Sequence, residues 1–320
     1  MQAVIYKNYG PPSVLSIKDV VRPAPKDKEL LIRVIATSVN RTDCAMLRAK
    51  PFIMRFFTGL FKPTKPILGT AFAGKVEAVG KDVDAFKIGE GVFGFDDTGV
   101  SSYAEYMTFP MEKALATIPD GITFAQAAAS SEGAHYAYNF INKVTIKKGD
   151  AILVYGATGA IGAAMVPLLK HLGAEVTAVC NTKNMDLVKS MGADEVIDYT
   201  KGDFTKGARK YPFVFDAVGK SSFGICKPLL QPGGVYISSE LGWMAQNIFF
   251  ALFTPIFGGK KVIFPIPTNI KRSIELVRQL MSEGKFNPVI DREYPLERIA
   301  EAFDYVELGQ KTGNVVITVG

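Results

Sequence analysis

The chain has 320 residues, 48% of them hydrophobic, which is long enough for two domains and apolar enough to bury a core in each. Its net charge of +6 comes from Lys and Arg residues spread along the whole chain, which argues against a nucleic-acid-binding arm, so we expect no nucleic-acid partner. The three cysteines, Cys44, Cys180 and Cys226, have no C-x-x-C spacing, which argues against a disulfide framework and favours a reducing compartment.

Residues 1–118 are predicted to form a compact, mostly β domain. Short strand-like runs such as Leu30–Ala36 and Gly74–Val79 are separated by Gly and Pro residues. The first residues, Met1–Tyr6, are themselves strand-like and are not a basic segment followed by an apolar signal core. We therefore expect a cytoplasmic protein.

From Thr123 onward the pattern changes to helix and then to alternating strands and helices. Residues Phe124–Val144 are Ala-rich and helical in pattern, and the alternation follows Lys148–Asp150. The expected strands are Ala151–Tyr155, Glu175–Val179, Glu195–Ile197, Phe213–Asp216 and Gly234–Ser238, and the expected helices are Ile161–Leu172, Asn184–Met191 and Phe223–Leu230. Such βαβ units predict an α/β fold with a doubly wound parallel sheet over residues 119–265.

The last part of the chain, 266–320, is predicted to return to the first domain. A β segment at Val262–Phe264 precedes it, helices are expected at Ile270–Glu283 and Ile299–Leu308, and Val315–Val319 reads as a strand. If that strand joins the first domain, the parallel-sheet domain is an insertion, and a cleft between the two domains is the expected ligand site.

The most informative motif is a glycine turn that follows the apolar strand Ala151–Tyr155. From Ala157 its spacing is A-x-G-x-x-G, close to the fingerprint of dinucleotide-binding folds. We expect Gly156 and Ala157 to form the tight turn, Gly159 to let the backbone approach phosphate, and Gly162 to let the helix pack on its strand. The residues predicted to hold the pyrophosphate are Gly156, Ala157, Thr158, Gly159, Ala160, Ile161 and Gly162.

The end of the second strand of this unit favours NADP(H) over NAD(H). Sites for NAD normally place an Asp or Glu there, on the ribose diol, whereas this chain has Asn181, Thr182 and Lys183. These residues offer hydrogen bonds and a positive charge to a 2′-phosphate. The alternative is a helix N-cap with a solvated lysine, and both can hold together.

Short motifs spread over nearly the whole chain resemble one family. They are V-N-R-T-D at 39–43, L-G at 68–69, A-G at 73–74, F-K-I-G at 86–89, K-G-D at 148–150, G-A-D-E-V-I-D-Y at 192–199, F-D-A-V-G at 215–219, P-G-G at 232–234 and G-N-V-V at 313–316. The chain resembles the zinc-independent quinone oxidoreductases of the medium-chain dehydrogenase/reductase superfamily. That family's fold is a GroES-like domain holding a Rossmann domain, in agreement with the organisation predicted above.

The resemblance also implies that no metal is bound. Zinc alcohol dehydrogenases of the superfamily carry ligands where this chain has Asn40 with Arg41 and Thr70 with Ala71, and their structural-zinc cysteines are missing. Glu132 could sit at a third ligand position, but one carboxylate does not hold zinc. The two histidines have other expected roles: His171 as a cation at a helix C-terminus, and His135 as a structural or pocket-lining residue.

The resemblance places Asn40 and Asp43 near the nicotinamide as candidate catalytic residues. The alternative for both is a polar turn that caps the backbone. A tyrosine that some relatives place five residues after the asparagine is Ala45 here, so no general acid is named. Val218, Gly219, Leu241 and Gly242 follow strands of the parallel sheet and are expected to contact the cofactor. The resemblance adds Tyr199 beside the 2′-phosphate, with a surface strand end as its alternative.

The predicted function is hydride transfer from NADPH, without zinc, to a quinone or an α,β-unsaturated carbonyl. Without a Lewis acid, an acceptor already activated by conjugation is favoured. One alternative is an NAD(P)-dependent alcohol dehydrogenase. Another, of a different class, is a weakly catalytic NADPH-binding sensor or an RNA-binding protein.

Two apolar segments, 51–61 and 243–257, are expected to cover something, because both are too apolar for ordinary loops. The first is predicted to be a lid, with plain core and contact with a membrane surface as less favoured alternatives. The second contains Pro255 and is too short to cross a bilayer. A homodimer is expected through Val262–Phe264, which resembles the edge strand used by the family, although an internal strand is the alternative.

Overall fold

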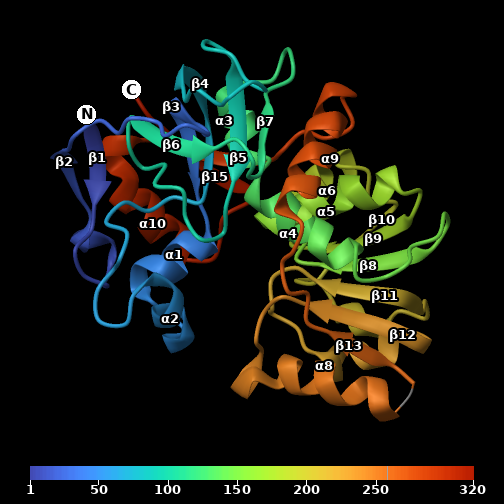
Figure 1. The fold of residues 1–320 in the computed structure, drawn as a ribbon. Helices are drawn as coiled ribbons and strands as arrows, with labels where there is room; N and C mark the ends of the chain where they lie inside the picture. Colours follow the sequence, from blue (N-terminus) through green and yellow to red (C-terminus); the bar gives the residue numbers. More distant parts are fainter. Residues whose placement is uncertain (258) are drawn as a thin grey trace. The chain divides into compact units, whose positions relative to one another are not determined.

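The computed structural model describes residues 1–257 and 259–320, which form two compact units (Figure 1). The first unit consists of Met1–Glu132 with Asn269–Gly320, and the second of Gly133–Thr268. By its contacts, the short helix α3 (Phe124–Ala129) belongs to the first unit. A nucleotide-binding domain with the limits 119–265 stays a prediction.

The first unit is built on a seven-stranded, mainly antiparallel sheet. The sheet has the order β14-β15-β3-β4-β5-β7, with β6 pairing with β3, and β1 and β2 form a separate hairpin. The strands are β1 (Gln2–Ile5), β2 (Ser16–Asp19), β3 (Glu29–Val39), β4 (Ala71–Val79), β5 (Gly91–Phe95), β6 (Tyr106–Pro110), β7 (Leu115–Thr117), β14 (Ile290–Pro295) and β15 (Asn314–Thr318). The helices, besides α3, are α1 (Arg41–Arg48), α2 (Arg55–Thr58), α9 (Ile270–Ser282) and α10 (Ile299–Glu307).

The C-terminal strand lies in the sheet of the first unit. Strand β15 pairs antiparallel with β3, with Val315 opposite Val39 and Ile317 opposite Thr37. Buried side chains from both ends of the chain, such as Ile32, Phe72, Phe303 and Ile317, share one hydrophobic core. The first part of the chain therefore closes its core only with the last fifty residues.

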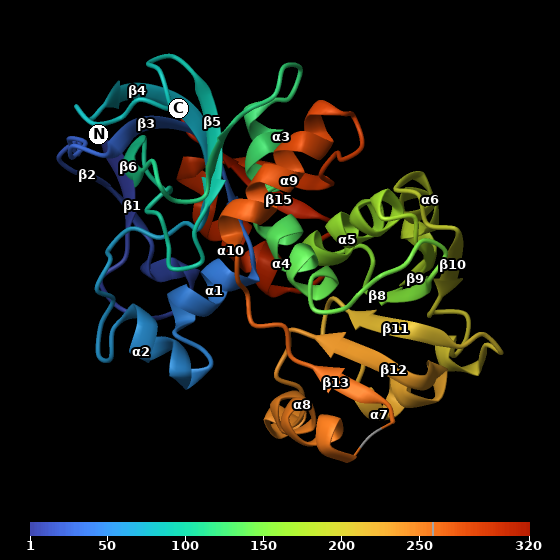
Figure 2. The ribbon, with the colours of Figure 1, turned by 45° about the vertical axis from the view of Figure 1, so that its right-hand side comes forward.

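The second unit is a six-stranded sheet in the order β10-β9-β8-β11-β12-β13, and every neighbouring pair is parallel. The strands are β8 (Ala151–Tyr155), β9 (Glu175–Cys180), β10 (Glu195–Asp198), β11 (Tyr211–Asp216), β12 (Leu230–Ser238) and β13 (Lys261–Ile263). The helices are α4 (Glu132–Ile141), α5 (Ala160–His171), α6 (Met185–Ser190), α7 (Phe223–Cys226) and α8 (Gln246–Phe257). Because the strand order reverses after β8, right-handed crossovers put α5 and α6 on one face and α7 and α8 on the other (Figure 2). The predicted doubly wound sheet is confirmed.

Three predicted helices differ in their boundaries for local reasons. The helical stretch Phe124–Val144 is two helices, because Ser130 and Ser131 bond back to Ala127 and end α3. The helix predicted at Asn184–Met191 is preceded by a 3-10 turn, Thr182–Asn184, and α6 begins at Met185. The helix at Phe223 ends after four residues, because Pro228 follows and a 3-10 turn, Lys227–Leu229, takes over.

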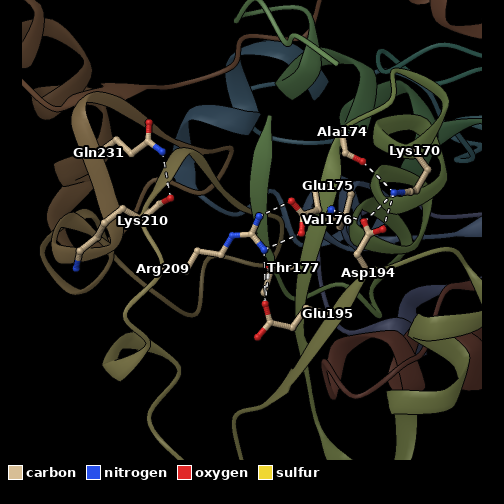
Figure 3. A network of polar contacts seen from close by, with 10 residues as sticks. All are labelled: Lys170, Ala174, Glu175, Val176, Thr177, Asp194, Glu195, Arg209, Lys210 and Gln231. Carbon is tan, nitrogen blue, oxygen red and sulfur yellow. Dashed lines mark hydrogen bonds and ion pairs between the residues drawn. The ribbon is translucent and has the colours of Figure 1, made fainter. Parts of the chain in front are cut away.

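Ion pairs tie together the amino ends of β9 and β10 (Figure 3). Lys170 of α5 donates to both carboxylate oxygens of Asp194, at 2.9 and 2.7 Å. Arg209 makes two hydrogen bonds to Glu175, at 2.9 and 2.5 Å. These contacts lie at the edge of the sheet opposite the carboxyl ends of the strands, where ligands bind in open α/β sheets. They fix strand positions, and their partial exposure keeps their contribution to stability small.

Candidate active site

The carboxyl ends of β8, β9, β10 and β11 meet at one edge of the parallel sheet. Gly156 N–H and Ala157 N–H donate to Val179 O of β9, at 3.2 and 3.3 Å, and Ala217 N–H donates to Tyr155 O of β8 at 3.0 Å. The strand order reverses between β8 and β11, so this is the switch point at which ligands bind in open α/β sheets.

The glycine turn has the geometry that a pyrophosphate needs. Gly156 has a φ of +80°, and a Cβ there would lie 2.3 Å from Val218 Cγ1. A Cβ on Gly162 would lie 2.2 Å from Gly156 O, so only glycine lets α5 approach the turn this closely. Gly159 caps α5 without a side chain, and its own Cβ direction is open to 3.9 Å. The first turn of a twelve-residue helix is thus left accessible to an anion.

The structure brings Asn181, Thr182 and Lys183 together at the end of β9, and also adds a carboxylate that the sequence argument missed. Asp198, at the end of β10, accepts a hydrogen bond from Thr182 Oγ1 at 2.5 Å and one from Thr200 Oγ1 at 2.7 Å. These hydroxyl donors lower the pKa of Asp198, so it is ionised. The pairing of β9 with β10 places Asp198 opposite Cys180, next to Asn181 and Thr182. A prediction of this strand pairing would have identified Asp198 as a residue of this corner.

Asn181 keeps an unpaired polar atom at this corner. Its Oδ1 is buried without a hydrogen-bond partner in the described part of the chain. Such an acceptor fits a ligand hydroxyl, such as one from a ribose. Lys183 is exposed, as a group that meets a phosphate needs to be.

Tyr199, Val218 and Gly219 also lie at this edge. Tyr199 is half exposed, its N–H donates to Cys180 O, and its ring centroid is 6.5 Å from that of Tyr155. The buried carboxylate of Asp216 accepts hydrogen bonds from Val218 N–H at 3.2 Å and Gly219 N–H at 2.7 Å. Asp216 therefore shapes the loop after β11, a structural role that sequence reasoning did not identify.

Leu241 and Gly242 follow β12 and open the segment that leads into α8. Leu241 O accepts a hydrogen bond from Asn247 N–H, and Gly242 has a φ of +70°. Asn247, buried in α8, donates its side-chain amide to Glu240 O at 2.8 Å. The loop is thereby held at both ends.

In the first unit, Asn40 is the N-cap of α1 and is held on both sides of its amide. Its Nδ2 donates to Ser38 Oγ at 3.2 Å, and its Oδ1 accepts from Lys311 Nζ at 3.2 Å. The backbone N–H of Asn40 donates to Asp43 Oδ2 at 2.9 Å. The capping role proposed as the alternative for these residues is thus present.

Asp43 and Glu132 form a buried carboxyl pair bridged by Thr70. Thr70 Oγ1 lies 3.2 Å from Glu132 Oε2 and 3.4 Å from Asp43 Oδ1, and Asp43 and Thr70 are fully buried. Burial raises the pKa of Asp43 well above its usual range, and the charge of Glu132 raises it further. Burial also raises the pKa of Glu132. Asp43 is fully buried, and its carboxyl contacts Asn40 and Thr70.

Lys311 completes this cluster and was not found from the sequence. Its Nζ donates to Asn40 Oδ1 and to Gly313 O. Burial lowers the pKa of its ammonium group to about 8, although Glu132 and Asp291 favour the charged form. Lys311 lies 271 residues after Asn40, so no local pattern links the two.

The side chains at the positions of the zinc ligands of related enzymes do not fit a metal. They are an amide, a hydroxyl and one carboxylate, and the ammonium of Lys311 lies on the amide oxygen. A cation beside these atoms opposes a second cation, and zinc sites need about three N, S or O ligands. Within residues 1–257 and 259–320, no three His, Cys, Asp or Glu residues are grouped to hold a metal ion.

The two histidines lie in helices α4 and α5. His135 in α4 is fully buried, and burial lowers the pKa of its ring to about 4, so it is neutral. Asn139 Nδ2 donates to His135 O at 2.9 Å and lies 3.2 Å from the ring Nε2. His171 is the last residue of α5, as predicted.

We expect Asp43→Asn to change how stability depends on pH. A carboxyl whose pKa is raised by folding costs stability once the unfolded chain ionises it, so its contribution falls as pH rises above about 4. The asparagine keeps an acceptor for Asn40 N–H but cannot ionise. Relative to wild type, the variant should gain on the order of 1 kcal/mol in free energy of unfolding between acid and neutral pH, measured by urea titration.

Asp203→Asn is the control of opposite sign. Hydrogen bonds from Thr205 lower the pKa of Asp203, so its contribution to stability is present above the unfolded pKa and is lost on acidification. This variant should lose stability relative to wild type as pH rises. Parallel curves for Asp43→Asn and wild type would show that Asp43 is not perturbed.

Comparison with known families gives two matches. The family model described as the alcohol dehydrogenase GroES-like domain matches residues 26–120, and the one described as zinc-binding dehydrogenase matches residues 191–317. The two matches fall on the first unit and on a segment that runs from the second unit back into the first.

Several characterised proteins are similar over almost the whole chain. The 2-methylene-furan-3-one reductase of Solanum lycopersicum is 31% identical, and the NADPH-dependent alkenal/one oxidoreductase, chloroplastic, of Arabidopsis thaliana is 30% identical; each alignment covers 99% of this chain and 79% of the relative. The quinone-oxidoreductase homolog, chloroplastic, of Spinacia oleracea is 30% identical, with 99% and 98% covered. Among solved structures, the quinone oxidoreductase from Coxiella burnetii is 25% identical, with a TM-score of 0.85 over 100% of this chain and 99% of that chain.

These relatives correct one prediction. The sequence led us to expect a cytoplasmic protein, but the Arabidopsis and spinach relatives are both named as chloroplastic. The reasoning failed because the absence of a signal pattern at the first residues does not specify a compartment.

Proposed function

Because the chain belongs to the quinone oxidoreductase-like family of the medium-chain dehydrogenases/reductases, we propose that it transfers hydride from NADPH to a quinone or an α,β-unsaturated carbonyl, without zinc. The observation that carries this proposal is the contact of Lys311 with Asn40 at the positions where related alcohol dehydrogenases bind their metal. With no metal to polarise an alcohol, a conjugated acceptor is the substrate class that fits.

The chain's residues fit a dinucleotide. The glycine turn Gly156–Gly162 would hold the pyrophosphate, and Val218, Gly219, Leu241 and Gly242 would contact the nicotinamide half from the ends of β11 and β12. Asn181 Oδ1 would accept a hydrogen bond from the ribose. When bound, the reduced nicotinamide supplies the hydride.

We propose that Lys183 and Tyr199 select NADP(H), in line with the cofactor named for the Arabidopsis relative. The hydroxyl of Thr182 already donates to Asp198 and is not available to a 2′-phosphate. Exposed Lys183 is the positive charge that this corner offers to that phosphate. We expect Lys183→Ala to raise the Kd for NADPH about tenfold and to leave the Kd for NADH unchanged. Fluorescence titration measures both.

The matched control is Lys189→Ala, on the exposed side of the following helix α6, which should change neither affinity. An equal loss of affinity for both nucleotides in Lys183→Ala would remove the phosphate assignment. So would tighter binding of NADH than of NADPH to the wild-type chain.

In the first unit, we propose that the Asn40 amide orients the ribose or the substrate oxygen. Its Oδ1 accepts from Lys311, its Nδ2 donates to Ser38, and its side chain also hydrogen-bonds to Glu132, so the orientation of the amide is fixed. The carboxyl of Asp43 would position Asn40 by accepting a hydrogen bond from its backbone N–H at the start of α1. Position 45 is an alanine, so the proton for the product would come from water or a nucleotide hydroxyl.

The test is an acceptor screen on the full-length chain. We expect NADPH oxidation with quinones or enones, little oxidation of a primary alcohol with NADP+, and no change after treatment with a chelator. Tight NADPH binding without turnover on any acceptor would favour a nucleotide-binding sensor. Alcohol oxidation that a chelator abolishes would favour a metal-dependent dehydrogenase.

We also propose a homodimer that forms by pairing of β13 with its copy. This strand is at the edge of the parallel sheet, so its outer hydrogen-bonding groups can extend the sheet. Light scattering measures the mass in solution, and a monomer at micromolar concentration would contradict the pairing.

A further inference from the structure

Helix α8 carries an apolar stripe that faces away from its own unit. Its exposed positions recur with a helical period, which places them on one face. They are Ile248, Phe249, Leu252, Phe253, Ile256 and Phe257, with exposures from 38% to 82%, and Trp243 and Met244 just before the helix are 77% and 73% exposed. A contiguous patch of this kind marks a contact surface rather than scattered exposed residues.

The opposite face of α8 holds the helix to the sheet. Phe250 contacts the ring of Phe223, with 5.6 Å between the centroids, and packs with Ala251 on the core of the second unit. Thr254 Oγ1 accepts a hydrogen bond from Val262 N–H of β13 at 2.9 Å. The exposed stripe is therefore the outer side of a packed helix, and its exposure does not come from a helix that lacks contacts.

Lysines lie close to this helix, and the nearest acidic residue before it in the sequence is Glu240, whose O accepts from Asn247. Lys261 precedes Val262, which bonds to the middle of α8, and Lys260 Nζ donates to Lys227 O at 2.7 Å. The ammonium of Lys227 lies 5.8 Å from the ring of Phe223, which in turn contacts α8. The sequence has no Asp or Glu from 241 to 274.

The first unit carries a second segment of the same kind around α2. Its exposed apolar residues are Phe52, Ile53, Phe56, Phe57 and Phe61, with exposures from 59% to 87%. Exposed Lys50, Lys62 and Lys65 flank them, and the sequence has no Asp or Glu from 44 to 76. The alternative that this segment is plain core is therefore wrong.

The lysines beside these two apolar surfaces indicate which kind of partner binds them. An isologous contact between two copies places the same surface against itself, and the lysines that flank it would then repel each other. An anionic lipid surface complements it, because lysines meet the headgroups while Phe and Leu side chains enter the acyl boundary. None of the helices in the described ranges has the length and apolar character to span a bilayer.

We infer that the exposed stripe of α8 in the second unit and the segment 50–65 in the first unit each bind the surface of an anionic phospholipid membrane. This function goes beyond hydride transfer and does not depend on it. It would bring the chain to the phase in which apolar quinones and long-chain enones dissolve.

The test is co-sedimentation of the full-length chain with vesicles, without any nucleotide or substrate. We expect binding to vesicles of phosphatidylcholine mixed with phosphatidylglycerol, weak binding to phosphatidylcholine alone, and weakening by salt. The pair Phe249→Ser with Phe253→Ser should reduce partitioning roughly tenfold or more. The pair Lys227→Glu with Lys260→Glu, which leaves β13 unchanged, should reduce it by roughly tenfold as well.

Matched controls change the same residue types elsewhere. Val21→Ser with Leu308→Ser removes two exposed apolar side chains of the first unit, and Lys7→Glu with Lys18→Glu reverses two exposed lysines. Both pairs should bind vesicles like wild type, and all variants should keep the wild-type circular dichroism. Wild-type protein that stays in the supernatant with both vesicle types would overturn the inference. An equal loss of vesicle binding in the control pairs would also overturn it. So would a wild-type dimer that does not bind vesicles and that the pair Phe249→Ser with Phe253→Ser dissociates.

Discussion

Gly162→Ala is expected to weaken NADPH binding more than tenfold and to lower the free energy of unfolding by roughly 1–3 kcal/mol. The added Cβ would lie 2.2 Å from Gly156 O and 2.7 Å from Ala157 Cα, and both are backbone atoms. Neither can rotate away, so α5 must move off the turn or the turn must open. Either movement displaces the helix amides that we propose to hold the pyrophosphate.

The control for this substitution is Gly224→Ala in α7. A Cβ there would meet only Ser222 Oγ at 3.9 Å, and alanine favours the helix, so stability should be unchanged or slightly higher. Thermal unfolding and fluorescence titration measure both quantities on each variant. If Gly162→Ala binds NADPH within a factor of two of wild type, the close approach of α5 to the turn is not needed for the cofactor.

The parts of the fold that could be predicted are those encoded in local patterns. The apolar run Ala151–Tyr155 and the glycines after it specify a strand, a turn and a helix by their own spacing, and the structure has the strand at the same bounds. The strand at the C-terminus was expected from its residues and was expected to return to the first domain, but its partner β3 was not predicted. Errors at helix ends arose where Ser130 or Pro228 competes with helical hydrogen bonding.

The parts that could not be predicted depend on contacts distant in the sequence. Asp198 joins Thr182 only because β10 pairs with β9, so the sequence argument found no carboxylate at that corner. Lys311 contacts Asn40 because β15 pairs with β3, and this pairing brings the loop before β15, which contains Lys311, to the end of β3. The apolar runs at 51–61 and 243–257 were recognised, but composition alone did not show which side chains face solvent.

Lys311→Met is expected to lower kcat/KM for the quinone or enone reaction by roughly 10- to 100-fold. The ammonium donates to the Oδ1 of Asn40 and its charge lowers the pKa of Glu132, so its loss leaves a buried acceptor unpaired beside a buried carboxyl pair. Lys311 acts as a positioning residue through Asn40. The exposed Lys285→Met, which removes only a surface ion pair with Glu283, should leave kcat/KM unchanged.

The pH profile separates this positioning role from a general loss of structure. Glu132, Asp291, Cys44 and Arg41 are the charged or titratable groups that act on the Lys311 ammonium, and burial sets its pKa at about 8. Wild-type kcat/KM should therefore fall as pH rises through about 8, because the ammonium loses its proton and its attraction to Glu132. Lys311→Arg stays protonated, so its activity should persist above that pH. If wild type and Lys311→Arg lose activity with the same alkaline pKa, another group causes the loss of kcat/KM at high pH. Lys311 then does not orient Asn40 through its charge.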